Sequence, residues 1–267
     1  KISHMHVVPT MFVRMLRLPE EVKAKYDMSS LVHVIHGAAP CPPEAKKGMI
    51  EWWGPVIFEY YGSTEAGIVS TANSADALAK PGTVGHPLDG TLVRIYDDEG
   101  NAVPQGESGE IYMSLNDLSD FTYHNKHDKR VEIERDGMVT NGDVGYQDED
   151  GYLFLNDRKR DMIISGGENI YPAEIEAALQ GMPGVQDCAV FGIPHDEFGE
   201  SVAAALELQP GASVSADAVK EYLRAHISAY KVPREVTFHD AMPREDTGKI
   251  FKRKLRQPYW DRAGRQI

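Results

Sequence analysis

The hydrophobic positions of residues 1–82 alternate between helical and strand spacing. Residues 9–16 carry apolar side chains at the intervals of one helix face, with proline in the first turn. Short apolar runs at 31–35 and 56–61 are typical of buried strands, and the stretch between them returns to helical spacing after two prolines, at 42 and 43. The sequence therefore predicts an α/β layer for this part of the chain.

Residues 83–157 follow a different pattern, in which short strands are separated by turn-forming residues. Apolar runs at 92–96 and 109–114 are typical of strands, the first of them followed by turn residues, and a hairpin is expected over 148–151. We predict a β-rich, barrel-like subdomain here.

After residue 157 helical and strand spacing alternate again. Pro172 begins a predicted helix that ends at Gly181 and turns Ile175 and Leu179 inward. Further elements are expected as strands at 188–193, 202–208 and 236–238 and as a helix over 219–227. We predict a small α+β domain of residues 158–267 after a first domain of residues 1–157.

Composition narrows the possible functions. The 267 residues carry a net charge of −13, which argues against a broad basic surface for nucleic acid. No run approaches the roughly 18 apolar residues of a membrane span, and the first residues do not resemble a signal peptide. Cys41 and Cys188 suggest neither a disulfide framework nor a zinc ribbon. We expect a cytoplasmic protein without an integral membrane segment or a nucleic-acid partner.

The first segment with candidate chemistry is residues 61–65, Tyr-Gly-Ser-Thr-Glu. A strand that ends in glycine and is followed by a hydroxyl and a carboxylate suits a phosphate and its Mg²⁺. Taken alone, the same residues fit better with a helix start capped by Ser63 or Thr64.

The second segment is Asn141-Gly142-Asp143, which we interpret as an exposed turn before an apolar strand. A fixed carboxylate at Asp143 could accept both hydroxyls of a ribose, as acidic residues do in dinucleotide sites. An ordinary turn without a ligand is the alternative.

Two further segments are richer in charge. Residues 151–176 place dense charge between two apolar strands, then a glycine pair, then the helix at Pro172; the alternative is a solvated linker with a glycine turn. Residues 243–255 gather basic side chains in an acidic protein, and Gly248 before Lys249 suggests a loop that presents one lysine, a compact charge on a flexible stem. An RNA-binding or solvated tail is the alternative there.

These four segments, in this order, resemble the adenylate-forming superfamily, which includes acyl-CoA synthetases, firefly luciferase and the adenylation domains of nonribosomal peptide synthetases. The resemblance extends over nearly the whole chain. It implies the end of a large N-terminal domain followed by a small mobile C-terminal domain. It also implies a ligase that uses ATP and Mg²⁺ to convert a carboxylic acid, through an acyl-adenylate, to a CoA thioester with release of AMP and pyrophosphate.

The resemblance also implies roles for individual residues. Those that would hold the nucleotide are Gly37, Ala38, Ala39, Pro40 and Tyr61 around the adenine, Gly62 and the Thr64 hydroxyl near the phosphates, Glu65 at Mg²⁺, and Asp143 with Arg158 at the ribose. Arg160 falls where the family has its hinge, and Gly166 and Gly167 would line the path of the pantetheine arm of CoA. Lys249 matches the family's adenylation lysine, so Lys249, Thr64 and Glu65 are the predicted catalytic residues.

Some features depart from the family. Its phosphate loop and the aromatic acyl-pocket motif that follows are not found in these residues, so we expect a fragment of an enzyme about twice this length. Asn141 stands where Thr is usual, and Arg160 where Asp or Lys is commoner. The sequences of residues 243–249 and 258–260 resemble fatty-acyl-type synthetases, which implies a medium-chain, long-chain or similarly hydrophobic acid as the substrate. A homo-oligomer is possible.

Other function classes fit less well. A nonribosomal adenylation domain should be followed by a carrier domain, and only a short tail follows Lys249. Luciferase-type oxidation stays open. Residues 199–203 lack the second glycine of a hydrolase nucleophile elbow, and the histidine pairs lack further metal ligands at a recognisable spacing. Residues 148–151 resemble a calcium loop without its bidentate Glu. A non-catalytic adenylate-binding fragment is the remaining alternative.

Overall fold

The computed structural model describes residues 1–115, 120–245 and 248–264, which form two compact units, Lys1–Asn156 and Asp157–Ile267. The boundary falls between two neighbouring residues that bond to different units. Asn156 Nδ2 donates to Ser108 Oγ (2.8 Å) in the first unit, and Asp157 Oδ2 accepts from Ala173 N (2.8 Å) in the second. The division lies one residue before the boundary expected from the sequence. That the units are domains of a larger enzyme stays a prediction.

The first unit is built on one long mixed sheet of open strand order β1-β2-β3-β4-β5-β10-β9-β7-β6, with β8 paired to β9. β1 to β3 are parallel, and the later pairings that are described are antiparallel. Its elements are β1 (His4–Val7), α1 (Pro9–Leu16), α2 (Glu20–Lys23), β2 (His33–His36), α3 (Pro43–Trp53), β3 (Ile57–Ser63), β4 (Gly67–Asn73), α4 (Ser74–Ala79), β5 (Thr83–Pro87), β6 (Thr91–Tyr96), β7 (Gly109–Leu115), α5 (His127–Glu132), β8 (Glu134–Arg135), β9 (Met138–Gln147) and β10 (Leu153–Arg158).

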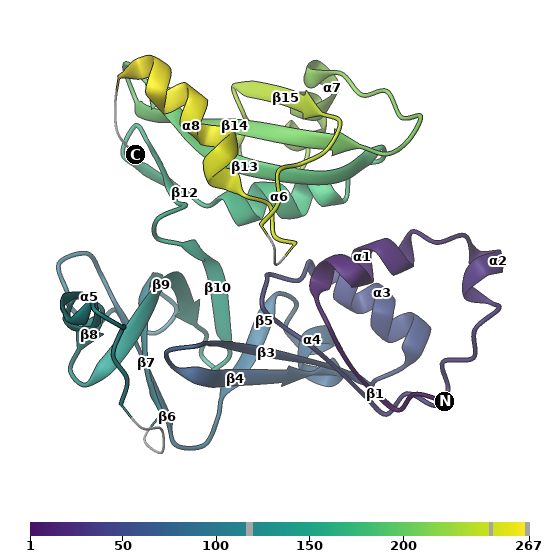
Figure 1. The fold of residues 1–267 in the computed structure, drawn as a ribbon, viewed down its shortest axis with the longest axis horizontal. Helices are drawn as coiled ribbons and strands as arrows, with labels where there is room; N and C mark the ends of the chain where they lie inside the picture. Colours follow the sequence, from purple (N-terminus) through teal and green to yellow (C-terminus); the bar gives the residue numbers. More distant parts are fainter. Residues whose placement is uncertain (116–119, 246–247, 265–267) are drawn as a thin grey trace. The chain divides into compact units, whose positions relative to one another are not determined.

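Two cores stabilise this unit. Helices α1 and α3 cover the parallel strands with Phe12, Met49 and Trp53, which are buried against Val34 and Ile57. The antiparallel part has its own cluster around Val69, Ile111, Met113 and Leu153. The predicted α/β layer and β-rich subdomain are both present, and Figure 1 shows them as the purple-to-blue and blue-to-teal parts of the ribbon.

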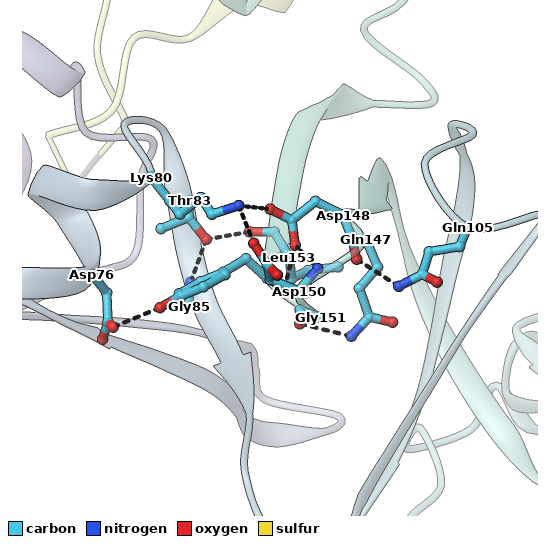
Figure 2. A network of polar contacts seen from close by, with 11 residues as sticks. Asp76, Lys80, Thr83, Gly85, Gln105, Gln147, Asp148, Asp150, Gly151 and Leu153 are labelled. Carbon is cyan, nitrogen blue, oxygen red and sulfur yellow. Dashed lines mark hydrogen bonds and ion pairs between the residues drawn. The ribbon is translucent and has the colours of Figure 1, made fainter.

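A network of polar contacts joins α4 and β5 to the turn between β9 and β10 (Figure 2). Lys80 Nζ donates to Asp148 Oδ2 (2.9 Å) and Asp150 Oδ2 (2.5 Å), and Tyr152 donates to Asp76 Oδ1 (3.0 Å). Donation of these hydrogen bonds to Asp150 and Asp148 raises the pKa of Lys80. The acidic turn over 148–151 therefore has a lysine as its partner, which accounts for its carboxylates without calcium.

The second unit is a three-layer α+β fold. Its sheet has the order β12-β11-β14-β13, and β15 pairs in parallel with β14. Its elements are β11 (Ile163–Ser165), β12 (Glu168–Ile170), α6 (Pro172–Gln180), β13 (Val185–His195), β14 (Gly199–Leu208), α7 (Ala216–Arg224), a 3₁₀ turn (Ala229–Lys231), β15 (Glu235–His239) and α8 (Lys252–Ala263). In Figure 1, α6 and the yellow α8 lie on opposite faces of β13 and β14.

β14 is buried on both faces. The predicted strand at 202–208 is present, and Val202, Ala204 and Leu206 pack against α6 and α7. The intervening Ala203 and Ala205 are buried as well, beneath α8. Small side chains at these positions let the helix approach the sheet closely.

Helix α8 was not expected from the sequence. Pro258 lies inside the helix, and basic residues crowd its first turns, a pattern that is typical of a loop and tail. Leu255 and Tyr259, four residues apart, supply the inward face that joins the core. None of the helices in the described part of the chain has the length and hydrophobicity that a bilayer span requires.

Candidate nucleotide and acyl-transfer site

The loop after β2 is pressed against the end of β3. A Cβ built on Gly37 would lie 2.6 Å from Tyr60 Cε1 and 2.8 Å from Tyr60 O, so only glycine allows this approach. The next residue, Ala38, is exposed and has φ +66°, a left-handed conformation that costs a non-glycine residue about 1–2 kcal/mol. Strain of this kind is found preferentially at binding sites. The structure thus brings the predicted loop 37–40 beside Tyr60 and its neighbour Tyr61.

Residues 61–65 do not begin a helix. β3 continues through Gly62 to Ser63 and turns tightly into β4, and Ser63 Oγ accepts the Ala66 N–H (3.1 Å) inside this turn. A Cβ on Gly62 would lie 2.0 Å from Gly67 O, so the glycine is required by the opposite strand of the hairpin. The helix-cap interpretation of Ser63 or Thr64 is therefore wrong, and the strand does not end at Gly62.

The tip of this hairpin carries the predicted phosphate and magnesium residues. Thr64 is exposed, and Glu65 is half-buried with its Oε1 accepting from the Tyr123 hydroxyl (2.8 Å). Desolvation, together with the bond to Glu65, raises the pKa of Tyr123, so the phenol stays protonated and donates to the carboxylate. Tyr123 was not expected at this site from the sequence. Its hydroxyl fixes Oε1 of Glu65 and does not occupy Oε2.

Glu65 suits Mg²⁺ in donor type. This ion prefers octahedral oxygen ligands and is commonly held by one or two carboxylates, with waters and substrate phosphates completing the set. Among the described residues there is no cluster of three or more His, Cys, Asp or Glu that could hold a metal by itself. One carboxylate at an exposed hairpin tip is thus compatible with an ion that arrives with a nucleotide.

The segment Asn141-Gly142-Asp143 is a β-bulge, not an exposed turn. In the pairing of β7 with β9, Tyr112 faces Thr140 and Glu110 faces Val144, so three residues of β9 stand opposite Ile111 alone. Gly142 adopts φ +78° to make this possible. Bulges bend a strand and redirect its side chains. Here the bulge turns Asp143 inward, leaving it 8% exposed.

Tyr61 and Asp143, 82 positions apart, form a direct pair. The Tyr61 hydroxyl donates to Asp143 Oδ2 (2.8 Å), and the same oxygen accepts from Asn141 Nδ2 (2.8 Å). Asn141, noted as a departure from the family pattern, therefore helps to hold the carboxylate. The Tyr61 ring is 7% exposed and packs in the β-rich core, so its stacking on adenine stays a prediction.

Beneath this loop and strand lies a buried charge cluster that the sequence analysis missed. Lys46 Nζ donates to Glu59 Oε2 and to Thr83 O (3.2 Å), and His36 Nδ1 lies 3.8 Å from Glu59 Oε1. Burial, and next the charge of Lys46, lowers the pKa of His36 to about 3, so the imidazole is neutral. The sequence did contain a sign of this burial. Lys46 lies at helical spacing from the apolar Met49 and Trp53, and Glu59 lies on the same strand face as Ile57 and Tyr61.

The remaining predicted site residues lie in the second unit. Gly166 and Gly167 form a two-residue hairpin loop between β11 and β12, with φ +61° and +88°. Two positive φ values in succession are what a type I′ turn requires. The glycine-turn interpretation is thus correct for the backbone, and a role toward pantetheine stays a prediction.

The charged segment after β10 is only partly solvated. Arg160 is exposed, and Arg158 is half-buried and accepts the backbone N–H of Asp161 (2.9 Å) and Met162 (3.1 Å) at its carbonyl. Asp157 is anchored at the start of α6, and burial raises its pKa against the opposing effect of Lys252. A pivot at Arg160 stays a prediction.

Lys249 is exposed at the end of a narrow loop before α8. Glu245 N donates to Lys249 O (2.8 Å), Arg244 and Ile250 form an isolated bridge, and Gly248 has φ +86°. Asp246 and Thr247 of this motif lie outside the described residues. The backbone around Lys249 is thus a defined turn and not a loose tail.

Two family models match the chain in this order. The one described as "AMP-binding enzyme" matches residues 1–119, and the one described as "AMP-binding enzyme C-terminal domain" matches residues 174–249, ending on Lys249. The chain belongs to the AMP-binding enzyme family.

Relatives of this AMP-binding enzyme include ligases for several acids. It is 36% identical over 248 residues to a long-chain-fatty-acid–CoA ligase of Bacillus subtilis, covering 92% of this chain and 44% of the relative. It is 38% identical over 253 residues to a feruloyl-CoA synthase of Amycolatopsis, covering 94% and 51%. The chain spans about half the length of the curated relatives it matches.

Solved structures agree with this assignment. ATP-bound MatB from Rhodopseudomonas palustris superposes with a TM-score of 0.87 at 32% identity, covering 98% of this chain and 52% of that one. The o-succinylbenzoate CoA synthetase of Bacillus subtilis, in complex with its acyl-adenylate intermediate, gives a TM-score of 0.83 at 30% identity, covering 95% and 51%. The fold of both units is therefore that of adenylate-forming enzymes.

Proposed function

We propose that the full-length protein carrying this chain is an ATP-dependent acyl-CoA synthetase. It activates a carboxylic acid as an acyl-adenylate with release of pyrophosphate, and then transfers the acyl group to the thiol of CoA with release of AMP. The observation that carries this proposal is the Tyr61–Asp143 pair, in which Tyr61 follows Tyr60, the β3 residue that the strained loop 37–40 contacts. A carboxylate held rigidly there could accept both hydroxyls of a ribose.

The chemistry of the first half-reaction explains the other residues. A carboxylate attacks an anionic phosphate poorly, so both groups must be neutralised and held in line. Thr64 would donate its hydroxyl to a phosphate oxygen, and the Lys249 ammonium would stabilise the charge that develops at the α-phosphate. Glu65 would hold Mg²⁺, which supplies positive charge to the phosphates when bound.

The second half-reaction calls for a different arrangement, since the thiol of CoA must reach the acyl-adenylate that Lys249 helped to form. We propose that the second unit is a mobile domain that turns about Arg160, with Arg158 assisting at the ribose. Gly166 and Gly167 would then line the path of the pantetheine arm, because a glycine turn leaves room beside the backbone.

For the acid, we propose a medium- or long-chain fatty acid or a similarly hydrophobic one. Support comes from relatives that are long-chain-fatty-acid–CoA ligases, in Bacillus subtilis and in Mycobacterium tuberculosis, the latter 37% identical over 253 residues. An aromatic acid is the second candidate, favoured by the feruloyl-CoA synthases at 38% identity.

A panel of acids tests this proposal. The full-length protein is incubated with ATP, Mg²⁺ and either saturated fatty acids of graded length or hydroxycinnamic and benzoic acids, and acid-dependent ATP–pyrophosphate exchange is measured. We expect exchange to rise with chain length and the aromatic acids to be at least about tenfold poorer, the size of effect a hydrophobic pocket achieves. The reverse order would establish the aromatic candidate, and no exchange with any acid would refute the synthetase.

A further inference from the structure

Two ion pairs flank the Lys249 loop, one before and one after the lysine. On the near side, Arg244 Nη2 contacts Asp187 Oδ2 (2.6 Å), and its Nη1 donates to Gly248 O (3.1 Å). On the far side, Lys252 Nζ contacts Glu176 Oε1 (2.8 Å). The loop is therefore held by charged side chains close to Lys249 in each direction.

Both ion pairs are connected to the same strand, one directly and one through α6. Asp187 belongs to β13, and Glu176, on α6, accepts the backbone N–H of Val190 in β13 with the oxygen that contacts Lys252 (2.7 Å). The strand is thereby connected to both sides of the loop. Between these anchors, Phe251 N donates to Pro243 O (2.8 Å) and closes the loop at its base.

The far pair is set into the protein and not spread on its surface. The side chains of Lys252 and Glu176 are 23% and 17% exposed. Burial raises the pKa of Glu176, an effect that Lys252 and the Val190 N–H oppose. Ion pairs in such places add little net stability over apolar residues of similar size, although loss of one partner is costly. A need to fix position explains the pair better than a need for stability.

We propose that Arg244 and Lys252 are positioning residues for Lys249 in the adenylation step. This inference rests on the proposed function. A lysine side chain is a flexible stem, so the placement of its charge depends on where the backbone starts. Misplacement by about 1 Å can cost on the order of 10²-fold in rate. The backbone position of Lys249 is set on one side by Lys252, which contacts Glu176 and through it β13. On the other side it is set by Arg244, which contacts Asp187.

Replacing Lys252 tests the far anchor. In the full-length protein, Lys252→Met keeps the aliphatic stem and removes the charge. We expect acid-dependent ATP–pyrophosphate exchange to fall by at least about tenfold, while thioester formation from a supplied acyl-adenylate stays within about twofold, because Lys249 has left the site by then. Lys252→Arg should recover most of the exchange. Lys254→Met is the matched control, since Lys254 is exposed two residues away.

A second measurement does not depend on the enzymatic reaction. In the full-length protein, hydrogen exchange of the Phe251 amide should accelerate in Lys252→Met, since that amide closes the loop, and not in Arg253→Met, at the exposed neighbouring position. Faster exchange in a protein that activates no acid would refute the proposed function and leave the anchor standing. In Lys252→Met, an equal loss of rate in both half-reactions would overturn the positioning role. So would an unchanged rate of hydrogen exchange at the Phe251 amide.

Discussion

At the scale of single residues, Lys249 and Asp143 differ in how they are held. Asp143 is buried and has its position set by hydrogen bonds from Tyr61 and Asn141. Lys249 is exposed, and its backbone is held in a turn by the hydrogen bond from Glu245 N to Lys249 O. In the proposed mechanism a ribose would stay bound through both half-reactions and would suit a rigid partner, whereas the adenylation lysine would leave between them. The two side chains therefore meet opposite mechanical requirements.

Lys249 should affect one half-reaction only. In the full-length protein, Lys249→Ala is expected to abolish acid-dependent ATP–pyrophosphate exchange, by more than about 10²-fold, because the charge that stabilises the transferring phosphate is lost. Thioester formation from a supplied acyl-adenylate should be spared. Lys254→Ala, with its exposed side chain, should leave both steps near wild type. Loss of both steps in Lys249→Ala would count against the mobile-domain proposal.

At the scale of elements, the bulge in β9 sets the direction of the Asp143 side chain. A regular ladder at 141–143 would alternate these side chains between the two faces of the sheet. The three residues that stand opposite Ile111 alone, two more than a regular ladder has, instead turn Asp143 toward Tyr61. The bulge depends on a positive φ at Gly142, so a substitution at Gly142 can alter the bulge while the Asp143 carboxylate is retained.

Two glycines allow a matched test of the bulge. At both Gly142 (φ +78°) and Gly137 (φ +76°) an added Cβ would meet open space, so alanine at either site carries a similar backbone cost of about 1–2 kcal/mol. Only Gly142→Ala should also weaken AMP binding, by roughly tenfold, because only it disturbs Asp143. Denaturant unfolding and calorimetric titration with AMP separate the two effects. Equal AMP affinity in both variants would argue against the ribose role of Asp143.

At the scale of the whole molecule, each unit has a separate core, and the first depends on a neutral buried histidine. His36 is fully buried next to the Lys46–Glu59 pair, and neither of its nitrogens has a hydrogen-bond partner among the described residues. Its pKa falls from 6.5 to about 3 on folding. The unfolded chain therefore binds more protons between these values, and stability that is present above pH 6.5 is lost as the pH falls toward 3.

This gives a pH dependence that belongs to one residue. Between pH 7 and pH 5 the first unit should lose about 2 kcal/mol of unfolding free energy through His36. His36→Phe should remove that part of the loss, and His124→Phe, at an exposed position, should not. Urea unfolding is followed by tryptophan fluorescence in a Trp260→Phe background, because Trp260 lies in the second unit. The remaining signal reports on the first unit, where Trp53 lies one ring away from His36 through Phe12. An identical pH dependence in all three proteins would refute the assignment.

The sequence by itself determined most of the elements and their order. Helix and strand spacing predicted the helices α1, α3, α6 and α7 and the strands β2, β3, β6, β7, β13, β14 and β15, because the period of their apolar residues records which positions are buried. The same was true of the Gly166–Gly167 turn and the Lys249 loop, where glycines mark the backbone directly. The strands β1, β4 and β5 of the large sheet were not predicted. What carried the family assignment was several motifs in a fixed order.

Only the tertiary structure decided the contacts between distant segments. The bulge at 141–143, the hairpin at 61–65 and the burial of Asp143 depend on the facing strands, which local spacing does not encode. Helix α8 was missed because its inward face is narrow and its first turns are basic, and the ion pair from Lys252 to Glu176 needs two elements to exist. Periodicity reports which face of an element is covered, while the partner that covers it is settled by the fold.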